Sequence, residues 1–113
     1  MPGPDILRGT LDLLILKALS WGPAHGYAVA RWIEQATGDA LAVGEGTLYP
    51  ALHRLEERKW ISASWGTSEN NRQAKFYALT KRGRSRLHVE TENWRRYAAA
   101  VFAALQAPAR PGE

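Results

Sequence analysis

The chain has 113 residues, a formal net charge of +4 at pH 7 and no cysteine. This length suits one small domain with a single core, and the missing cysteines exclude disulfides, thiolate metal sites and cysteine nucleophiles. The mild positive excess favours a nucleic-acid partner. No signal peptide is recognisable and no stretch approaches the ~20 apolar residues of a membrane span, so we expect a cytoplasmic protein that does not enter a membrane.

The first third of the chain predicts two helices. Residues 11–20 form a pattern that is apolar on nearly all sides, with Thr10 as a suitable N-cap, so we expect this helix to be buried on more than one side. Residues 25–37 predict a second helix. Its expected inner stripe consists of Tyr27, Ala30 and Ile33, with Ala36 as a further candidate.

Residues 45–59 predict a third helix, which is the main candidate for a DNA-binding element. Leu48, Leu52 and Leu55 stand at i, i+4 and i+7, the spacing of one buried helix face. The opposite side carries small, hydrogen-bonding or cationic residues, which suits insertion into a DNA groove. Pro50 lacks an N–H, so we place it in the first turn and expect the helix to begin between residues 44 and 47. An ordinary amphipathic surface helix is the alternative.

After residue 59 the hydrophobic period changes from 3.6 to 2. Residues 60–65 alternate as a strand, residues 66–74 are a polar loop, and residues 75–79 alternate again. Two strands joined by a polar loop predict a hairpin. Three side chains near its tip could lie along a phosphate backbone: Arg72, Gln73 and Lys75.

The last predicted helix has Thr80 as its N-cap and tolerates Gly83 in its first turn at some cost. Gaps of four and three residues then alternate for about two and a half heptads, as in a coiled-coil seam. Little of the domain is left to cover this seam, so we infer that it packs on another chain. The seam residues are Leu87, Thr91, Trp94, Ala98, Val101 and Leu105.

The order of elements is helix, helix, helix, hairpin, long helix. It predicts a mainly α (α+β) fold, a winged helix-turn-helix with a two-stranded wing and a long C-terminal dimerisation helix. We assign residues 1–79 to the DNA-binding part, residues 80–107 to the dimerisation helix of the same compact unit, and residues 108–113 to a tail.

Several stretches resemble the PadR family of transcriptional regulators. They are Gly-Thr-Leu-Asp-Leu-Leu-Ile-Leu-Lys-Ala-Leu (9–19), His-Gly-Tyr (25–27), Gly-Thr-Leu-Tyr-Pro-Ala-Leu-His-Arg-Leu-Glu (46–56), the strand 60–65, Arg-Gln-Ala-Lys-Phe-Tyr-Ala-Leu-Thr (72–80) and Gly83. They cover about nine-tenths of the chain in the right order. The single short C-terminal helix resembles the compact branch of the family.

The resemblance implies a homodimeric regulator, usually a repressor, on an inverted-repeat operator in double-stranded DNA. The helix from residue 46 would enter the major groove, and the wing would touch the backbone or minor groove through Arg72, Gln73 and Lys75. The helix contacts carried over by position are Thr47, Tyr49, Pro50, His53 and Arg54.

Trp94 resembles, in position, a tryptophan on which some compact, multidrug-sensing members stack planar aromatic ligands at the dimer interface. The same residue occupies a seam position, where an aromatic side chain normally only packs. Both interpretations stay open from the sequence.

The sequence gives little support for a metal site or a catalytic site. His25, His53 and His88 are far apart and none has a partner at metal-ligand spacing, so we predict no metal site; His25 could cap its helix. No nucleophile motif, phosphate loop or cofactor motif is present, and we predict that the protein is not an enzyme. Two alternatives remain beside specific DNA binding: a winged-helix module that binds a protein, and a double-stranded RNA binder.

Overall fold

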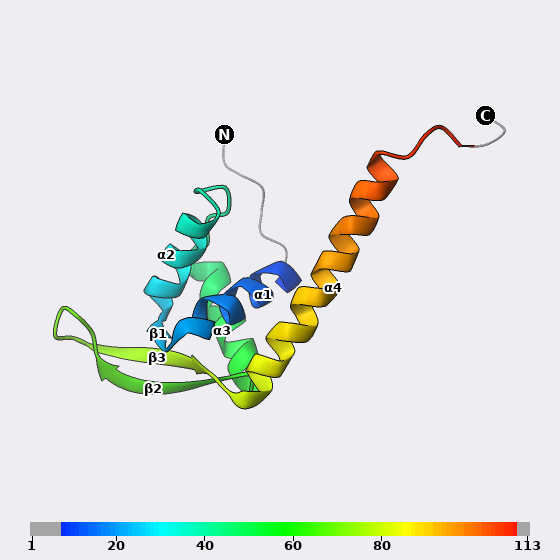
Figure 1. Cartoon of the computed structure of the whole chain (residues 1–113). Coiled ribbons are helices and arrows are strands. Elements are labelled where there is room, and N and C mark those ends of the chain that lie inside the picture. Colours follow the sequence, from blue (N-terminus) through cyan, green and yellow to red (C-terminus); the bar gives the residue numbers. More distant parts are fainter. Residues whose placement is uncertain (1–7, 111–113) are drawn as a thin grey trace.

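The computed structural model describes residues 8–110 and shows the predicted winged helix-turn-helix, with its long C-terminal helix (Figure 1). The elements in chain order are α1 (Arg8–Ala18), a 3-10 turn η1 (Leu19–Trp21), β1 (Ala24–His25), α2 (Gly26–Ala36), α3 (Glu45–Glu57), β2 (Ile61–Thr67), β3 (Gln73–Leu79) and α4 (Lys81–Leu105). No helix in the described part of the chain is long and apolar enough to cross a membrane.

The wing is the β2–β3 hairpin, and it is longer than predicted. Its antiparallel register runs from Ile61 opposite Leu79 to Thr67 opposite Gln73, which leaves a loop of residues 68–72. The sequence pattern misses the outer pairs because polar strand ends pair through backbone groups that carry no hydropathy signal. A two-residue strand, β1, adds to the other side of β3, so the sheet order is β1-β3-β2.

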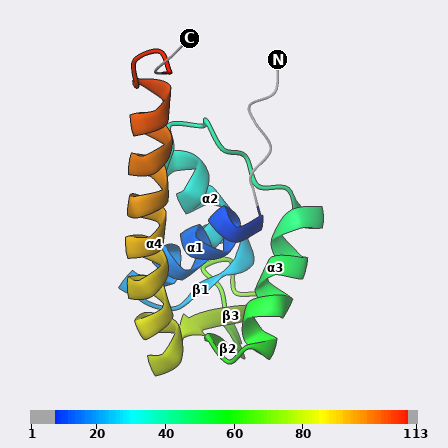
Figure 2. The ribbon, with the colours of Figure 1, turned by 90° about the vertical axis from the view of Figure 1, so that its right-hand side faces the viewer.

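Helix α1 is the centre of the fold. It lies between α3 and α4 (Figure 2) and contacts both, so its apolar sides are covered as expected. The residues of the first helix and turn that lie fully inside the core are Leu11, Ile15, Leu16 and Leu19. Thr10 is inside α1 and not its N-cap, because the helix already includes Arg8, three residues before its predicted start.

Two expectations about α2 have different outcomes. The predicted cap is confirmed, since His25 Nδ1 accepts a hydrogen bond of 3.2 Å from the Ala28 N–H. The predicted inner stripe is partly wrong. Ile33 is fully buried, but Tyr27 is 67% exposed and Ala36 is exposed as well. Val29 takes the buried position near the start of the helix. Tyr27 is only the second residue of α2, where the outer side of the helix already faces the wing.

Helix α3 begins at Glu45 after Gly44, within the predicted window. Pro50, however, is the sixth residue of the helix, so its predicted place in the first turn is wrong. A proline there removes the hydrogen bond to the carbonyl four residues earlier, at Gly46. Both residues are exposed, so water can reach the freed carbonyl and the interruption is tolerated.

Helix α4 starts at the root of the wing and runs beyond the domain. Thr80 is its N-cap, as predicted, and its hydroxyl oxygen accepts a hydrogen bond of 3.0 Å from the Gly83 N–H. The C-terminal half of α4 projects past the other elements (Figure 1), and the chain measures 66 × 36 × 21 Å along its principal axes.

Candidate nucleic-acid interface

The outer side of α3 is the candidate recognition surface. Its inner side is completely buried through Leu48, Ala51, Leu52 and Leu55. The outer side bears four of the five side chains that sequence analysis assigned to DNA contact, and all four are exposed: Thr47, Tyr49, Pro50 and His53. The leucine spacing therefore orients this helix as the pattern predicts.

Arg54, the fifth predicted contact, is turned inward. Its Nη2 atom lies 2.5 Å from Asp12 Oδ1 in α1, and the two side chains are only 20% and 13% exposed. The guanidinium therefore already has an intramolecular partner, and the structure does not present it on the outer side of α3 with the other four residues. Asp12 lies 42 residues away in the chain, so no local pattern could have revealed this contact.

His53 also has a partner, but one on the surface. Its Nε2 atom lies 2.8 Å from Glu57 Oε1, one turn further along α3, and both side chains are well exposed. Such an exposed pair contributes little to stability and leaves the imidazole accessible.

Tyr49 ties the recognition helix to the start of α2. A Cβ atom on Gly26 would stand 3.1 Å from the Tyr49 hydroxyl oxygen, so only a glycine allows the ring to lie this close without displacement. The ring is still 47% exposed. Through this contact the His-Gly-Tyr stretch lies beside α3.

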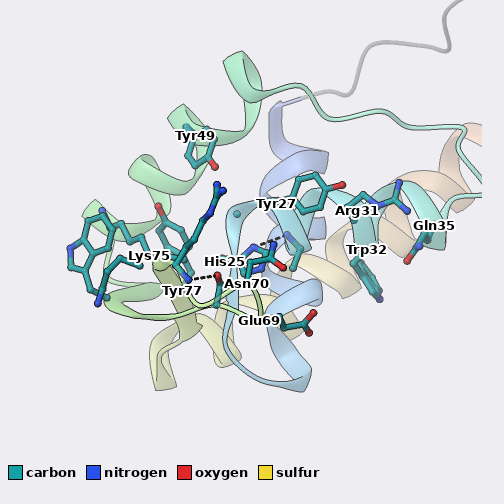
Figure 3. Close-up of a pocket in the computed structure, with 17 residues that line it drawn as sticks. His25, Tyr27, Arg31, Trp32, Gln35, Tyr49, Glu69, Asn70, Lys75 and Tyr77 are labelled. Atoms are coloured by element: carbon teal, nitrogen blue, oxygen red, sulfur yellow. Dashed lines mark hydrogen bonds between the residues drawn. The ribbon is translucent and has the colours of Figure 1, made fainter.

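A groove of about 1070 Å³ separates the first turns of α2 and the Tyr49 ring from the wing (Figure 3). All three predicted wing residues, Arg72, Gln73 and Lys75, line it. The groove therefore brings the wing and one predicted residue of α3 to a common surface. Sequence analysis did not assign several other lining residues to such a surface, among them Tyr27, Arg31 and Trp65.

Lys75 links the wing to α3 within this groove. Its Nζ atom lies 3.5 Å from Glu56 Oε1 and 5.7 Å from the centroid of the Tyr77 ring, and its side chain stays 40% exposed. Tyr77 is buried beneath it, and that burial raises the pKa of its phenol against the opposing effect of the Lys75 charge. The cation can still face a phosphate, although its charge is partly balanced by Glu56.

The loop of the wing has a defined turn. The Ser68 N–H donates to the Arg72 carbonyl over 2.8 Å, and the Asn71 N–H donates to the Ser68 carbonyl over 2.9 Å. Asn71 has a φ of 57°, in the left-handed region that asparagine tolerates better than most residues. This turn presents the Arg72 side chain, which is exposed, at the tip of the hairpin.

The predicted seam of α4 divides into two parts. At its start Leu87 is partly buried and packs against the core of its own chain, so part of its surface is already covered within the chain. Thr91 is half-buried and donates a hydrogen bond of 2.7 Å to the Leu87 carbonyl. From Trp94 onward the large apolar side chains are exposed: Trp94, Tyr97, Val101, Phe102 and Leu105.

A smaller hollow of about 320 Å³ lies between the start of α1 and the middle of α4. Thr10 and Leu13 line it from α1, and Trp94 and Tyr97 line it from α4. The two aromatic rings are 5.7 Å apart between centroids and inclined by 33°. Trp94 is thus accessible beside a hollow, as ligand stacking would require.

Helix α3 is anchored by buried leucines and has an exposed outer side, and a hairpin wing follows it in the chain. A groove lined by Arg31, Arg72 and Lys75 lies between the wing and α2. These features define a winged helix-turn-helix protein. The sequence model of the transcriptional regulator PadR-like family matches residues 15–89. The chain belongs to this family and is a DNA-binding transcriptional regulator. Family and fold imply a regulator and not an enzyme.

Solved structures and a named relative agree with this assignment. A PadR-like transcriptional regulator from Bacillus cereus has a TM-score of 0.76 and 26% identity, with 90% of this chain and 97% of that chain covered. A transcriptional regulator from Clostridium thermocellum has a TM-score of 0.76 and 29% identity, with 83% and 91% covered. The transcriptional regulator YqjI of Escherichia coli is 34% identical over 104 residues, which span 88% of this chain and 48% of that protein.

Proposed function

We propose that the protein is a homodimeric repressor that reads an inverted-repeat operator. In this account α3 enters the major groove with its exposed side, which carries Thr47, Tyr49, Pro50 and His53. The wing follows the adjacent backbone with Arg72, Gln73 and Lys75. Major-groove base edges distinguish all four base pairs, whereas backbone contacts fix register and orientation without reading sequence.

The observation that carries the dimer is the uncovered apolar side of α4. Phe102 is 62% exposed and Leu105 is 75% exposed, and Val101 and Trp94 extend the same surface toward the domain. Nothing within residues 8–110 covers this stretch, and a contiguous exposed apolar surface of this kind usually marks an interface. A second copy would cover it with its own matching stretch.

Two copies related by a two-fold axis present two α3 helices in opposite orientation. Such a dimer fits half-sites that are about one duplex turn apart, ~34 Å, on the same side of the DNA. Repression would follow where such a site overlaps a promoter, since the bound dimer excludes the transcription machinery.

A planar aromatic effector is proposed to bind at the hollow between α1 and α4 and to stack on Trp94. The support for it is the accessible pair of rings formed by Trp94 and Tyr97 beside the hollow. An effector can release DNA only if it binds more tightly to the arrangement of α1 and α4 that does not fit the operator.

The dimer is tested by a charge placed on the uncovered face. Val101→Glu is expected to shift the protein to a monomer in sedimentation velocity and to weaken binding to a selected inverted-repeat duplex more than tenfold. Ala103→Glu places the same charge on the opposite side of the helix, where Ala103 is exposed, and should change neither property. A dimer that persists in Val101→Glu would contradict the proposed interface.

The effector is tested by fluorescence titration with acridine dyes in the absence of DNA. In Trp94→Phe, most of the quenching of dye fluorescence that the parent protein causes should be lost. Equal quenching in both proteins would end the proposal that Trp94 holds a ligand.

A further inference from the structure

The recognition helix is joined to α1 by an ion pair that is largely removed from water. The guanidinium of Arg54 and the carboxylate of Asp12 approach to 2.5 Å, and their side chains are 20% and 13% exposed. Four other ion pairs between described residues leave both side chains between 32% and 74% exposed. The Asp12–Arg54 pair therefore differs in kind from the surface pairs.

The Asp12–Arg54 pair is better suited to orienting α3 than to stabilising the fold. Taking two charges out of water is unfavourable, and a buried pair often contributes little net stability, although it can fix a unique geometry. The Arg54 Nε atom is also buried and has no hydrogen-bond partner among the described residues, which adds to that unfavourable term. A pair kept under such conditions points to a role in geometry.

Apolar packing selects the side of α3 that faces the core, and a directional contact can set the rotation of the helix more closely. Leu48, Leu52 and Leu55 bury one side of the helix, but hydrophobic contact has no preferred direction. A guanidinium–carboxylate contact is directional, because planar donors must meet carboxylate oxygens. Arg54 stands directly between the outward His53 and the buried Leu55, so holding its side chain against α1 fixes the rotation of α3 about its own axis.

The partner residue lies in the element that connects α3 to α4. Helix α1 contacts α3 on one side and α4 on the other (Figure 2), and Leu13, the residue after Asp12, lines the hollow beside α4. Helix α1 therefore couples the orientation of α3 to α4, the helix that carries the proposed dimer interface.

From these contacts we infer that Asp12 and Arg54 are positioning residues for sequence-specific DNA binding. They hold the outer side of α3 at the angle at which it reads base edges, and Arg54 acts without touching DNA itself. The inference rests on the proposed role of the outer side of α3 in operator recognition.

The two possible roles of Arg54 predict opposite effects of Asp12→Asn on specific DNA binding. If Arg54 touched DNA, Asp12→Asn would free it and leave specific binding unchanged or tighter. If the pair positions α3, Asp12→Asn and Arg54→Gln each weaken binding to a duplex selected from a random-sequence pool by about tenfold, similar to one mismatched base pair. The double variant should then bind the selected duplex about as tightly as the more impaired single variant, because both changes remove the same interaction.

A second readout separates positioning from general damage to the fold. Binding to a scrambled duplex of equal length depends on phosphate contacts and not on the rotation of α3, so Asp12→Asn should change it by less than about twofold. Arg54→Lys keeps the charge but lacks the planar donors, and should lose specific binding like Arg54→Gln. Glu92→Gln, which removes the exposed partner of Arg95, is the matched carboxylate control and should behave like the parent.

Unchanged or tighter specific binding in Asp12→Asn would overturn the inference, and so would an equal loss on both duplexes. If Asp12→Asn does not fold, Asp12→Glu, which moves the carboxylate by one methylene, gives the same test with the same expected loss. If the parent protein does not distinguish the selected from the scrambled duplex, the proposed operator recognition fails instead, which keeps the two failures apart.

Discussion

The carbonyl oxygen of Trp60 occupies the space in which a side chain on Gly83 would begin. A Cβ atom on Gly83 would stand 1.8 Å from that oxygen, far inside van der Waals contact. The Thr80 N–H donates to the same carbonyl over 3.1 Å, and the Thr80 hydroxyl donates to the Lys59 carbonyl over 2.6 Å. The first turn of α4 is therefore locked against the root of the wing, where α3 ends and β2 begins.

Gly83→Ala is expected to destabilise the protein by about 3 kcal/mol or more, because the obstructing atom is backbone and cannot rotate away. Thermal unfolding should show a midpoint lower by more than about 10 °C. Gly9→Ala is the control, since Gly9 lies in α1 and no heavy atom of the described residues comes within 4 Å of its missing Cβ. This change should stabilise the helix by up to about 1 kcal/mol. Equal midpoints for Gly83→Ala and the parent would contradict the close contact.

Tyr49 is expected to serve both packing and recognition. Tyr49→Ala removes the ring that packs on Gly26 and should weaken binding to the selected duplex by about 1–3 kcal/mol, while sedimentation still shows a dimer. Tyr49→Phe keeps the ring and loses only the hydroxyl. Comparison of the two variants in fluorescence anisotropy therefore assigns the effect to the ring or to the hydroxyl, and full affinity in both would remove Tyr49 from the interface.

Arg72 at the tip of the wing is expected to contact phosphate and not a base. Arg72→Gln should weaken binding to all duplexes by a similar factor, and the slope of log K against log salt should fall by about 1 for each protomer. Arg95→Gln removes the same charge from α4, where Arg95 pairs with Glu92, and should leave the slope unchanged. A change of preference between sequences in Arg72→Gln would mean that the wing reads bases.

Tyr77 is expected to make stability fall at alkaline pH. Burial raises the pKa of its phenol in the folded protein above the value of about 10 in the unfolded chain. The unfolded chain then loses this proton first as pH rises, so the contribution is complete below pH ~10 and is lost as pH rises through the folded pKa. Unfolding midpoints measured between pH 9 and pH 11 should fall less steeply for Tyr77→Phe than for the parent, and identical slopes would contradict the assignment.

The parts of the fold that can be predicted from the sequence are those with a sustained period. Leu48, Leu52 and Leu55 repeat over two turns, so their spacing alone indicates which side of α3 faces the core. The seam of α4 is visible for the same reason, but spacing cannot tell that Leu87 packs on its own core. Whether a stripe faces its own chain or another depends on tertiary packing and not on period.

The parts that sequence patterns miss depend on contacts between distant residues or on very short segments. Strand β1 has two residues, too few for any alternation to be recognised. Tyr27 fits a helical stripe by spacing, yet it lies outside the core because the wing groove begins there. The Asp12–Arg54 pair joins residues from two helices, so only the packing of α1 against α3 shows that Arg54 is withdrawn from the surface.

The most direct test of the account is selection of bound duplexes from a random-sequence pool with the full chain, followed by footprinting of the recovered site. We expect an inverted repeat whose half-sites have centres about 10 bp apart, each protected in the major groove by one α3 helix. Enrichment of a single asymmetric site, or no enrichment above the starting pool, would contradict paired recognition helices as the basis of binding.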